Sequence, residues 1–218
     1  MKKFGLWIVV PLVLLCGSDV VKAKELVSPV VEETKIQKDV ENFVQNLGNK
    51  AIEIINKPGI SKGQVQKEFK ELLQNHFALR DIARYSLGNF YRELSKEEEQ
   101  DFLRCFENML VKVYSSNFSA YKTAKLVVTG GKIKTTKKGK QQILVYSNVV
   151  VPNKADVNVT WSVFSTEGRN HKVYDVIIDN VSISSSQRSE FRGSIVKNSL
   201  KKFLEKFKKD HSKIEGEV

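Results

Sequence analysis

The spacing of apolar residues changes near residue 121. Before it, apolar side chains recur every three or four residues, as on one face of an amphipathic helix. The pattern predicts helices over Ile36–Ile55, Val65–Phe77 and Phe102–Phe118, the last preceded by Ser95 and Glu98 at the spacing of a capping box. A basic amphipathic helix over about 188–210 is predicted to end the chain.

After residue 121 the apolar positions alternate with polar ones, which predicts strands. The glycine pair at 130–131 predicts a turn or bulge. The short connections between the strands force antiparallel neighbours. The predicted strands are Lys125–Thr129, Gln142–Val151, Asp156–Ser165 and His171–Ile183.

Helices followed by a strand meander predict an α+β domain, with helices packed on one face of an antiparallel, four-stranded sheet. The helical part covers about residues 35–121, the sheet part about 122–186, and the C-terminal helix about 188–210. Strand alternation places aliphatic side chains on one face of this sheet. Periodicity alone leaves open whether the interior is a filled core or a hollow.

The first 23 residues differ from the rest. Lys2 and Lys3 precede an apolar run from Phe4 to Cys16, which as a helix would span about 20 Å and fall short of a bilayer core of about 30 Å. Ala23 ends a plausible cleavage site. We therefore predict a secretory signal peptide over 1–23 and a single mature domain over 24–218. An uncleaved anchor and a lipoprotein signal at Cys16 are the alternatives.

Composition narrows the function classes. The 218 residues are 41% hydrophobic and 28% charged, which excludes a wholly disordered chain and a multi-span membrane protein. The formal net charge is +11. In an exported chain this balance favours an anionic membrane surface or acidic proteins as partners over nucleic acid, or it serves solubility alone. Two cysteines and three scattered histidines predict neither a disulfide framework nor a metal site.

Several short motifs stand out along the chain. They are Phe69, Leu72 and Leu73; Ile82, Ala83, Leu87 and Gly88; Phe102, Phe106, Tyr114 and Tyr121; Val173–Val176; Val181–Ile183; and Arg188 with Phe191. Together these motifs resemble the MlaC/Ttg2D family, the periplasmic phospholipid-binding proteins also known as toluene-tolerance auxiliary proteins. The resemblance covers roughly residues 36–207. Asn180 stands where the family usually has glycine, and asparagine tolerates the left-handed backbone better than most residues.

The resemblance implies a fold and a function. The fold would be a curved, cystatin/NTF2-like sheet with a helical subdomain over its concave face and an apolar cavity between them. The protein would be a monomeric, non-enzymatic lipid transport protein of the periplasm, with phospholipid as its carried ligand and no other cofactor. Its partners would be an inner-membrane Mla-type ABC transporter complex and an outer-membrane MlaA-type lipoprotein with a porin, and its role would be outer membrane lipid asymmetry.

The cavity that the resemblance implies would lie between the aliphatic face of the sheet and the apolar stripes of the helices. Its predicted lipid-binding lining is Val145, Val149, Val159, Trp161, Val163, Val176 and Ile178 from the sheet, with Phe69, Leu73, Phe102, Phe106, Met109 and Val113 from the helices.

Two other functions stay open. NTF2-like cavities also host small-molecule enzymes, which here would need an acid and a base such as Asp175 with Tyr174 or His171. A scaffold that binds only proteins is the other. The lysine-rich C-terminal helix is either a packed surface helix or a docking element for anionic headgroups.

Overall fold

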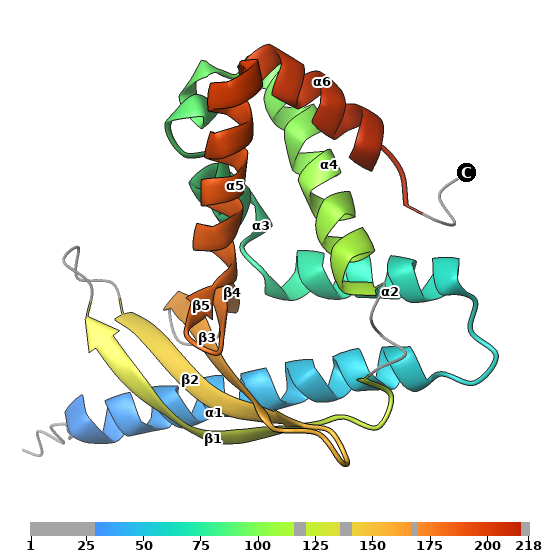
Figure 1. The fold of residues 1–218 in the computed structure, drawn as a ribbon. Helices are drawn as coiled ribbons and strands as arrows, with labels where there is room; N and C mark the ends of the chain where they lie inside the picture. Colours follow the sequence, from blue (N-terminus) through green and yellow to red (C-terminus); the bar gives the residue numbers. More distant parts are fainter. Residues whose placement is uncertain (1–28, 116–120, 136–140, 167–169, 215–218) are drawn as a thin grey trace, which may run out of the picture.

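The computed structural model describes residues 29–115, 121–135, 141–166 and 170–214, so the predicted signal peptide lies outside the described residues. The fold is α+β, as predicted (Figure 1). The helices are α1 (Pro29–Asn56), α2 (Lys62–His76), α3 (Leu79–Leu87), the 3₁₀ helix η1 (Gly88–Glu93), α4 (Lys96–Ser115), α5 (Ile183–Asn198) and α6 (Leu200–His211). The strands are β1 (Lys125–Thr135), β2 (Gln141–Val150), β3 (Val157–Thr166), β4 (Asn170–Ile178) and β5 (Val181–Ser182).

The antiparallel sheet has five strands in the order β1-β2-β3-β4-β5, so the prediction of four was wrong. The predicted strand 171–183 is two strands, because Asp179 and Asn180 both take positive φ angles, 46° and 68°. These angles reverse the chain, and the two-residue β5 pairs back onto the end of β4. Asn180 thus adopts the left-handed backbone expected of it.

Two irregularities keep the apolar residues of the sheet on one face. In β1 the register shifts between Val128 and Gly130. In β4 the partners of Trp161 and Val163 are Val176 and Val173, so one extra residue of β4 lies between the pairs. Val173 and Val176 are three residues apart, so simple alternation would place them on opposite faces of the sheet. The extra residue of the bulge brings both side chains to the same face. The glycine pair at 130–131 therefore marks a bulge, and β1 continues through it.

Helix α1 runs along one face of the sheet, which we call the inner face (Figure 1). Its apolar stripe is buried there against β1, β2 and β3. A Cβ on Gly48 would lie 2.3 Å from Leu126 Cδ2, so the missing side chain sets how closely α1 approaches β1. Gln45 fixes the register, because its side chain donates to the carbonyl of Leu126 and accepts from the N–H of Val128.

Helices α3, α4, α5 and α6, with η1, form a separate helical part in the upper half of Figure 1, and α2 lies between this part and the sheet. The core of the helical part is a phenylalanine cluster in which neighbouring rings lie 5.0–6.3 Å apart. Where one C-terminal helix over 188–210 was predicted, the structure has α5 and α6, separated at Ser199, whose φ of 75° breaks the helix. The turn lets α6 pack back on α4. The cluster comprises Phe102, Phe106, Phe191, Phe203 and Phe207.

Two motifs far apart in sequence meet where α3 ends. Gly88 has φ 65° and ψ −134°, a backbone conformation that favours glycine. Arg188 of α5 lies directly against it and donates from Nη1 to the carbonyl oxygen of Tyr85 at 3.1 Å. A Cβ at position 88 would lie 3.2 Å from Arg188 Nη2. The Leu-Gly and Arg-x-x-Phe motifs are therefore the two sides of one contact.

Replacing Gly88 with Ala is expected to lower the free energy of unfolding by about 1–3 kcal/mol, the cost of a strained backbone conformation. Urea unfolding measures it. Gly193→Ala is the matched control, because Gly193 lies inside α5 with no neighbour within 4 Å of a new Cβ. It should raise stability by up to about 1 kcal/mol through helix propensity. Equal effects of the two substitutions would contradict this account.

Candidate functional site: the apolar inner face of the sheet

The strand register places all seven predicted sheet residues on the inner face. In antiparallel pairs, residues directly opposite one another share a face. The pairs Val145–Trp161, Trp161–Val176 and Val159–Ile178 connect β2, β3 and β4, and Val163 and Val149 follow by alternation along β3 and β2. The predicted set is thus one continuous apolar surface across three strands.

Burial divides this surface into two regions. Val145, Val159 and Val163 are at most 5% exposed. The other four, Val149, Trp161, Val176 and Ile178, are only half-buried. The reason is the position of α1, which lies mainly on β1 and less on β2 and β3. The inner face therefore continues beyond its covering helix as a half-buried apolar area that runs from Val149 at the end of β2 onto β3 and β4.

Two polar side chains on the inner face are paired. The indole N–H of Trp161 donates to Ser147 Oγ at 2.9 Å, and the Ser147 hydroxyl donates to the carbonyl oxygen of Val159 at 3.1 Å. Ser147 is only 3% exposed. A buried polar group without a partner costs free energy, so this chain of hydrogen bonds keeps the part of the surface around Trp161 apolar. Further along β3 and β4, Ser165 Oγ and His171 Nδ1 are buried without a hydrogen-bond partner among the described residues.

Helix α2 supplies the opposing side chains. Phe69 and Phe77 are half-buried and pack against the cluster formed by α1 and the sheet, as Phe43 of α1 does. Phe69 was predicted as lining, whereas Phe43 and Phe77 were not, although both lie in the apolar stripes of their helices. Leu73 lies deeper, in a small cluster between α2 and α4 that includes Val111. The structure therefore brings Phe69, but not Leu73, to the inner face.

The predicted residues of α4 lie elsewhere. Phe102, Phe106 and Met109 are buried in the helical part, packed with side chains of α5 and α6. Val113 is 51% exposed at the other end of the helix. The apolar stripe of α4 is buried as predicted from its spacing, but it packs against α5 and α6 and not against the sheet. Sequence spacing shows that a stripe is buried and does not show against what.

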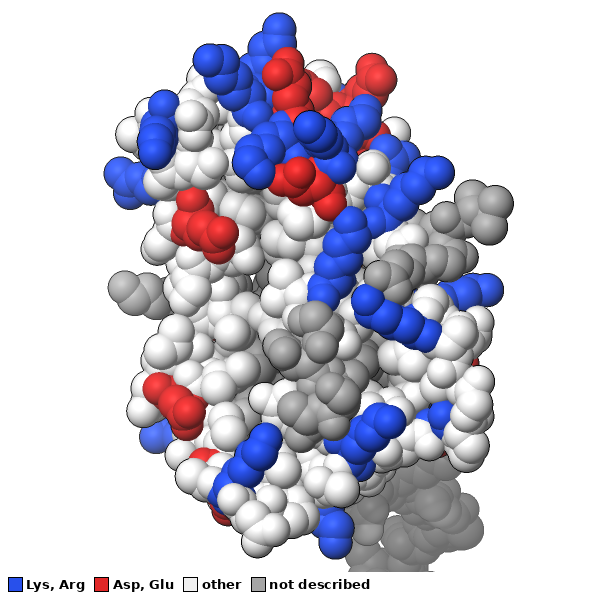
Figure 2. All heavy atoms as spheres, turned by 45° about the vertical axis from the view of Figure 1, so that its right-hand side comes forward, with Lys and Arg blue, Asp and Glu red and all other residues white. Residues whose placement is uncertain are grey.

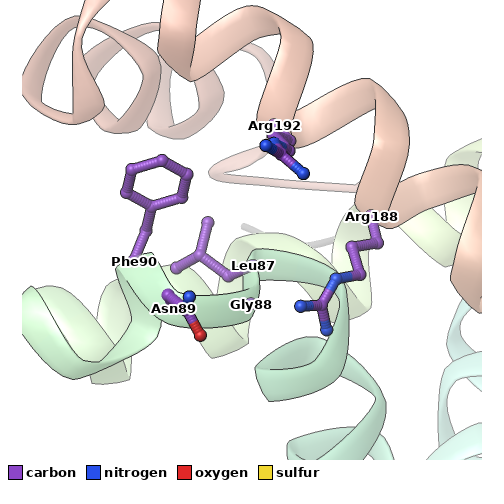
Figure 3. A pocket seen from close by; sticks show the side chains of 6 residues that line it. All are labelled: Leu87, Gly88, Asn89, Phe90, Arg188 and Arg192. Atoms are coloured by element: carbon purple, nitrogen blue, oxygen red, sulfur yellow. The ribbon is translucent and has the colours of Figure 1, made fainter.

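The pockets that we describe also belong to the helical part. One, of about 300 Å³, is lined by Leu87, Gly88, Asn89, Phe90, Arg188 and Arg192 (Figure 3). The other, of about 260 Å³, lies between the start of α4 and α6. Ligand pockets commonly measure roughly 300–1,000 Å³. Both are too small for a lipid with two acyl chains, so the inner face stays the candidate surface for a long apolar ligand.

The residues weighed for acid–base chemistry are engaged separately. Asp175 accepts hydrogen bonds from the Ser182 hydroxyl at 2.6 Å and from the N–H of Ser184 at 3.1 Å, and so serves the start of α5. The ring of Tyr174 lies 4.7 Å from that of Phe164, centroid to centroid. His171 lies against Phe43. These contacts do not assemble the three into one catalytic arrangement.

Within 29–115, 121–135, 141–166 and 170–214, no helix combines the length and hydropathy of a bilayer span. The same ranges contain no group of three or more His, Cys, Asp and Glu side chains that could hold a metal ion.

The fold and the site define a class: an α+β protein with helices over a sheet whose apolar inner face is only partly covered. The family model for the MlaC protein matches residues 45–209, most of the chain, so this chain belongs to the MlaC family. No curated protein matches it in sequence.

A solved structure shares this fold. It is that of a phospholipid-binding protein from Ralstonia solanacearum, in complex with a phospholipid. The TM-score is 0.63 at 17% sequence identity, over 79% of this chain and 98% of that one.

Two histidines flank the inner face beside Phe43. The ring of Phe43 lies 5.7 Å from that of His76 and 5.4 Å from that of His171. Burial lowers the pKa of both histidines below the ordinary 6.5, and Lys50 lowers that of His76 further. Both side chains therefore favour the neutral form in the folded protein.

Stability is expected to fall as pH drops below about 6.5. There the unfolded chain takes up protons before the folded one, which favours unfolding. Carboxylates titrate lower, so the window from pH 7 to about 5.5 isolates the histidines. Chemical unfolding of the wild type and of a His76→Gln/His171→Gln variant measures the effect, and the variant should show the flatter pH dependence. A wild type whose stability rises on acidification would refute this.

Proposed function

We propose that this protein is a periplasmic phospholipid carrier that holds acyl chains against the inner face of its sheet. The observation that carries the proposal is the half-buried apolar area formed by Val149 at the end of β2 and by Trp161, Val176 and Ile178 on β3 and β4. Phe69 of α2 and Phe77, directly after α2, pack against the same cluster. Membership of the MlaC family supports it, as does the phospholipid bound by the protein from Ralstonia solanacearum with the same fold.

The energetics require such a surface. Each methylene removed from water is worth about 0.8 kcal/mol, so two chains with about 30 methylenes would cost roughly 24 kcal/mol if exposed. No diffusing protein could carry lipid with its tails in water. Transfer from a bilayer to an apolar protein interior exchanges one apolar medium for another, so loading and unloading can both stay near balance.

Lipid binding has a structural consequence. The described pockets are small and distant from the inner face, and aromatic side chains fill the space beside β3 and β4. Acyl chains must therefore displace half-buried side chains such as Phe69, Phe77 and Trp161. These residues are only half-buried, whereas Val145 and Val163 are fully buried. The tails would therefore lie over β3 and β4 rather than under α1.

The wider role follows from the family. We propose that an N-terminal signal peptide exports the chain and that the carrier exchanges lipid with an inner-membrane Mla-type ABC transporter complex and an outer-membrane MlaA-type lipoprotein with a porin. The phospholipid is then cargo, and the protein needs no catalytic residue.

Gentle purification followed by lipid extraction and mass spectrometry should find phospholipid bound to the wild type. Val149→Trp and Val176→Trp fill the half-buried area and should remove most of that lipid. Val150→Trp is the matched control, because it adds the same bulk to the same strand on the opposite face. Lipid bound equally by all variants, or by none including the wild type, would refute the proposed site.

A further inference from the structure

The pocket between the end of α3 and α5 carries two arginines and no acidic residue (Figure 3). Arg188 and Arg192 reach into it from successive turns of α5, and Leu87 and Phe90 form an apolar floor on the opposite side. Neither arginine forms an ion pair with a carboxylate of the described residues. Two unneutralised guanidinium groups beside an apolar floor favour an anionic ligand.

Arg188 is held in place before any ligand binds. Its Nη1 donates to the carbonyl oxygen of Tyr85, and its Cζ lies 4.9 Å from the centroid of the Tyr85 ring. Its Nε and Nη2 atoms face Gly88, where a Cβ would lie 3.5 and 3.2 Å from them. The edge of the guanidinium that Nε and Nη2 form thus faces space that a side chain at position 88 would occupy.

Arg192 supplies the second positive charge. Its side chain is exposed, and no hydrogen bond or ion pair engages it among the described residues. Two of the five lysines of α6 are engaged in ion pairs: Lys206 pairs with Asp210, and Lys208 with Asp101. Figure 2 shows acidic and basic side chains mixed at the end of the molecule where these helices lie. The arginine pocket is therefore the stronger candidate for anion recognition.

We propose that Arg188 and Arg192 form a binding site for a phosphate group, separate from the inner face of the sheet. Guanidinium groups match phosphate oxygens in pairs, and the low-dielectric floor of Leu87 and Phe90 strengthens the attraction. A volume of about 300 Å³ accommodates a headgroup-sized ligand and excludes acyl chains. The phosphate comes either from a lipid headgroup at a membrane surface or from free phosphate.

Two probes distinguish these sources. Binding of inorganic phosphate is measured by NMR from the shifts of the Gly88 and Asn89 amides. Binding of phosphatidylcholine vesicles that contain phosphatidylglycerol is measured by flotation. The variant is Arg192→Gln, which removes no internal contact, and Lys197→Gln is the control, because it removes one charge from the same helix outside the pocket. Arg192→Gln should weaken phosphate binding about tenfold or more, and Lys197→Gln should leave it unchanged.

Vesicle binding that Arg192→Gln weakens and Lys197→Gln does not would identify the lipid headgroup as the source. Vesicle binding that both variants retain, together with phosphate binding lost only in Arg192→Gln, would identify free phosphate. Absence of saturable binding of either probe to the wild type, or equal loss in the two variants, would overturn the proposal. Lipid co-purified with Arg192→Gln should match the wild type, so this result is independent of the proposed carrier function.

Discussion

One helix cannot cover a five-stranded sheet, and the candidate site follows from that constraint. Four spacings of about 4.8 Å make the sheet about 19 Å wide, whereas a helix with its side chains is about 10 Å across. Helix α1 lies at the β1 side, where Gly48 and Gln45 fix it against β1. The inner face over β3 and β4 is then only partly covered, and Phe69 of α2 and Phe77 contribute to that cover. An apolar surface left half-covered in this way is stabilised further by any apolar ligand that completes its burial.

The two parts of the molecule have separate main cores, so a ligand bound at the inner face would not require the helical part to unfold. The phenylalanine cluster is closed among α3, α4, α5 and α6, while the sheet packs on α1 and α2. Some attachments between the parts meet on β4, where the N–H of Ala78 donates to the carbonyl oxygen of Val173 and Asp175 accepts from the start of α5. Others join α2 to α4, where Gln66 donates to Ser115 and Lys70 to Asn108. Rearrangement of Phe69 or Trp161 over the inner face therefore leaves these attachments and the phenylalanine cluster in place.

The features that depend on local periodicity could be predicted from the sequence. The features that depend on single backbone conformations or on which elements pack together could not. The helices over 36–55, 65–77 and from 102, and the four long strands, follow from spacing. So does the inner face, because alternation along a strand fixes which side chains share a side. The left-handed backbone of Asn180 was expected from the resemblance, but the division of the strand at Asp179–Asn180 and of the helix at Ser199 was missed, because single residues with positive φ leave no periodic signal. The partner of the α4 stripe was missed for another reason. An apolar stripe looks the same whether it packs on a sheet or on helices α5 and α6, and only tertiary structure distinguishes the two.

The residues that reveal the family are largely not the residues that would hold a lipid. Gly88 and Arg188 form the contact between α3 and α5, and Val173–Val176 contains the bulge and the carboxylate that begins α5. Each needs a particular residue type for a backbone or hydrogen-bonding reason, so each leaves a recognisable motif. The inner face needs only apolar side chains of suitable size, which many combinations of valine, isoleucine and aromatic residues provide. A motif match therefore identifies this fold well, and the ligand surface has to be argued from strand register and burial.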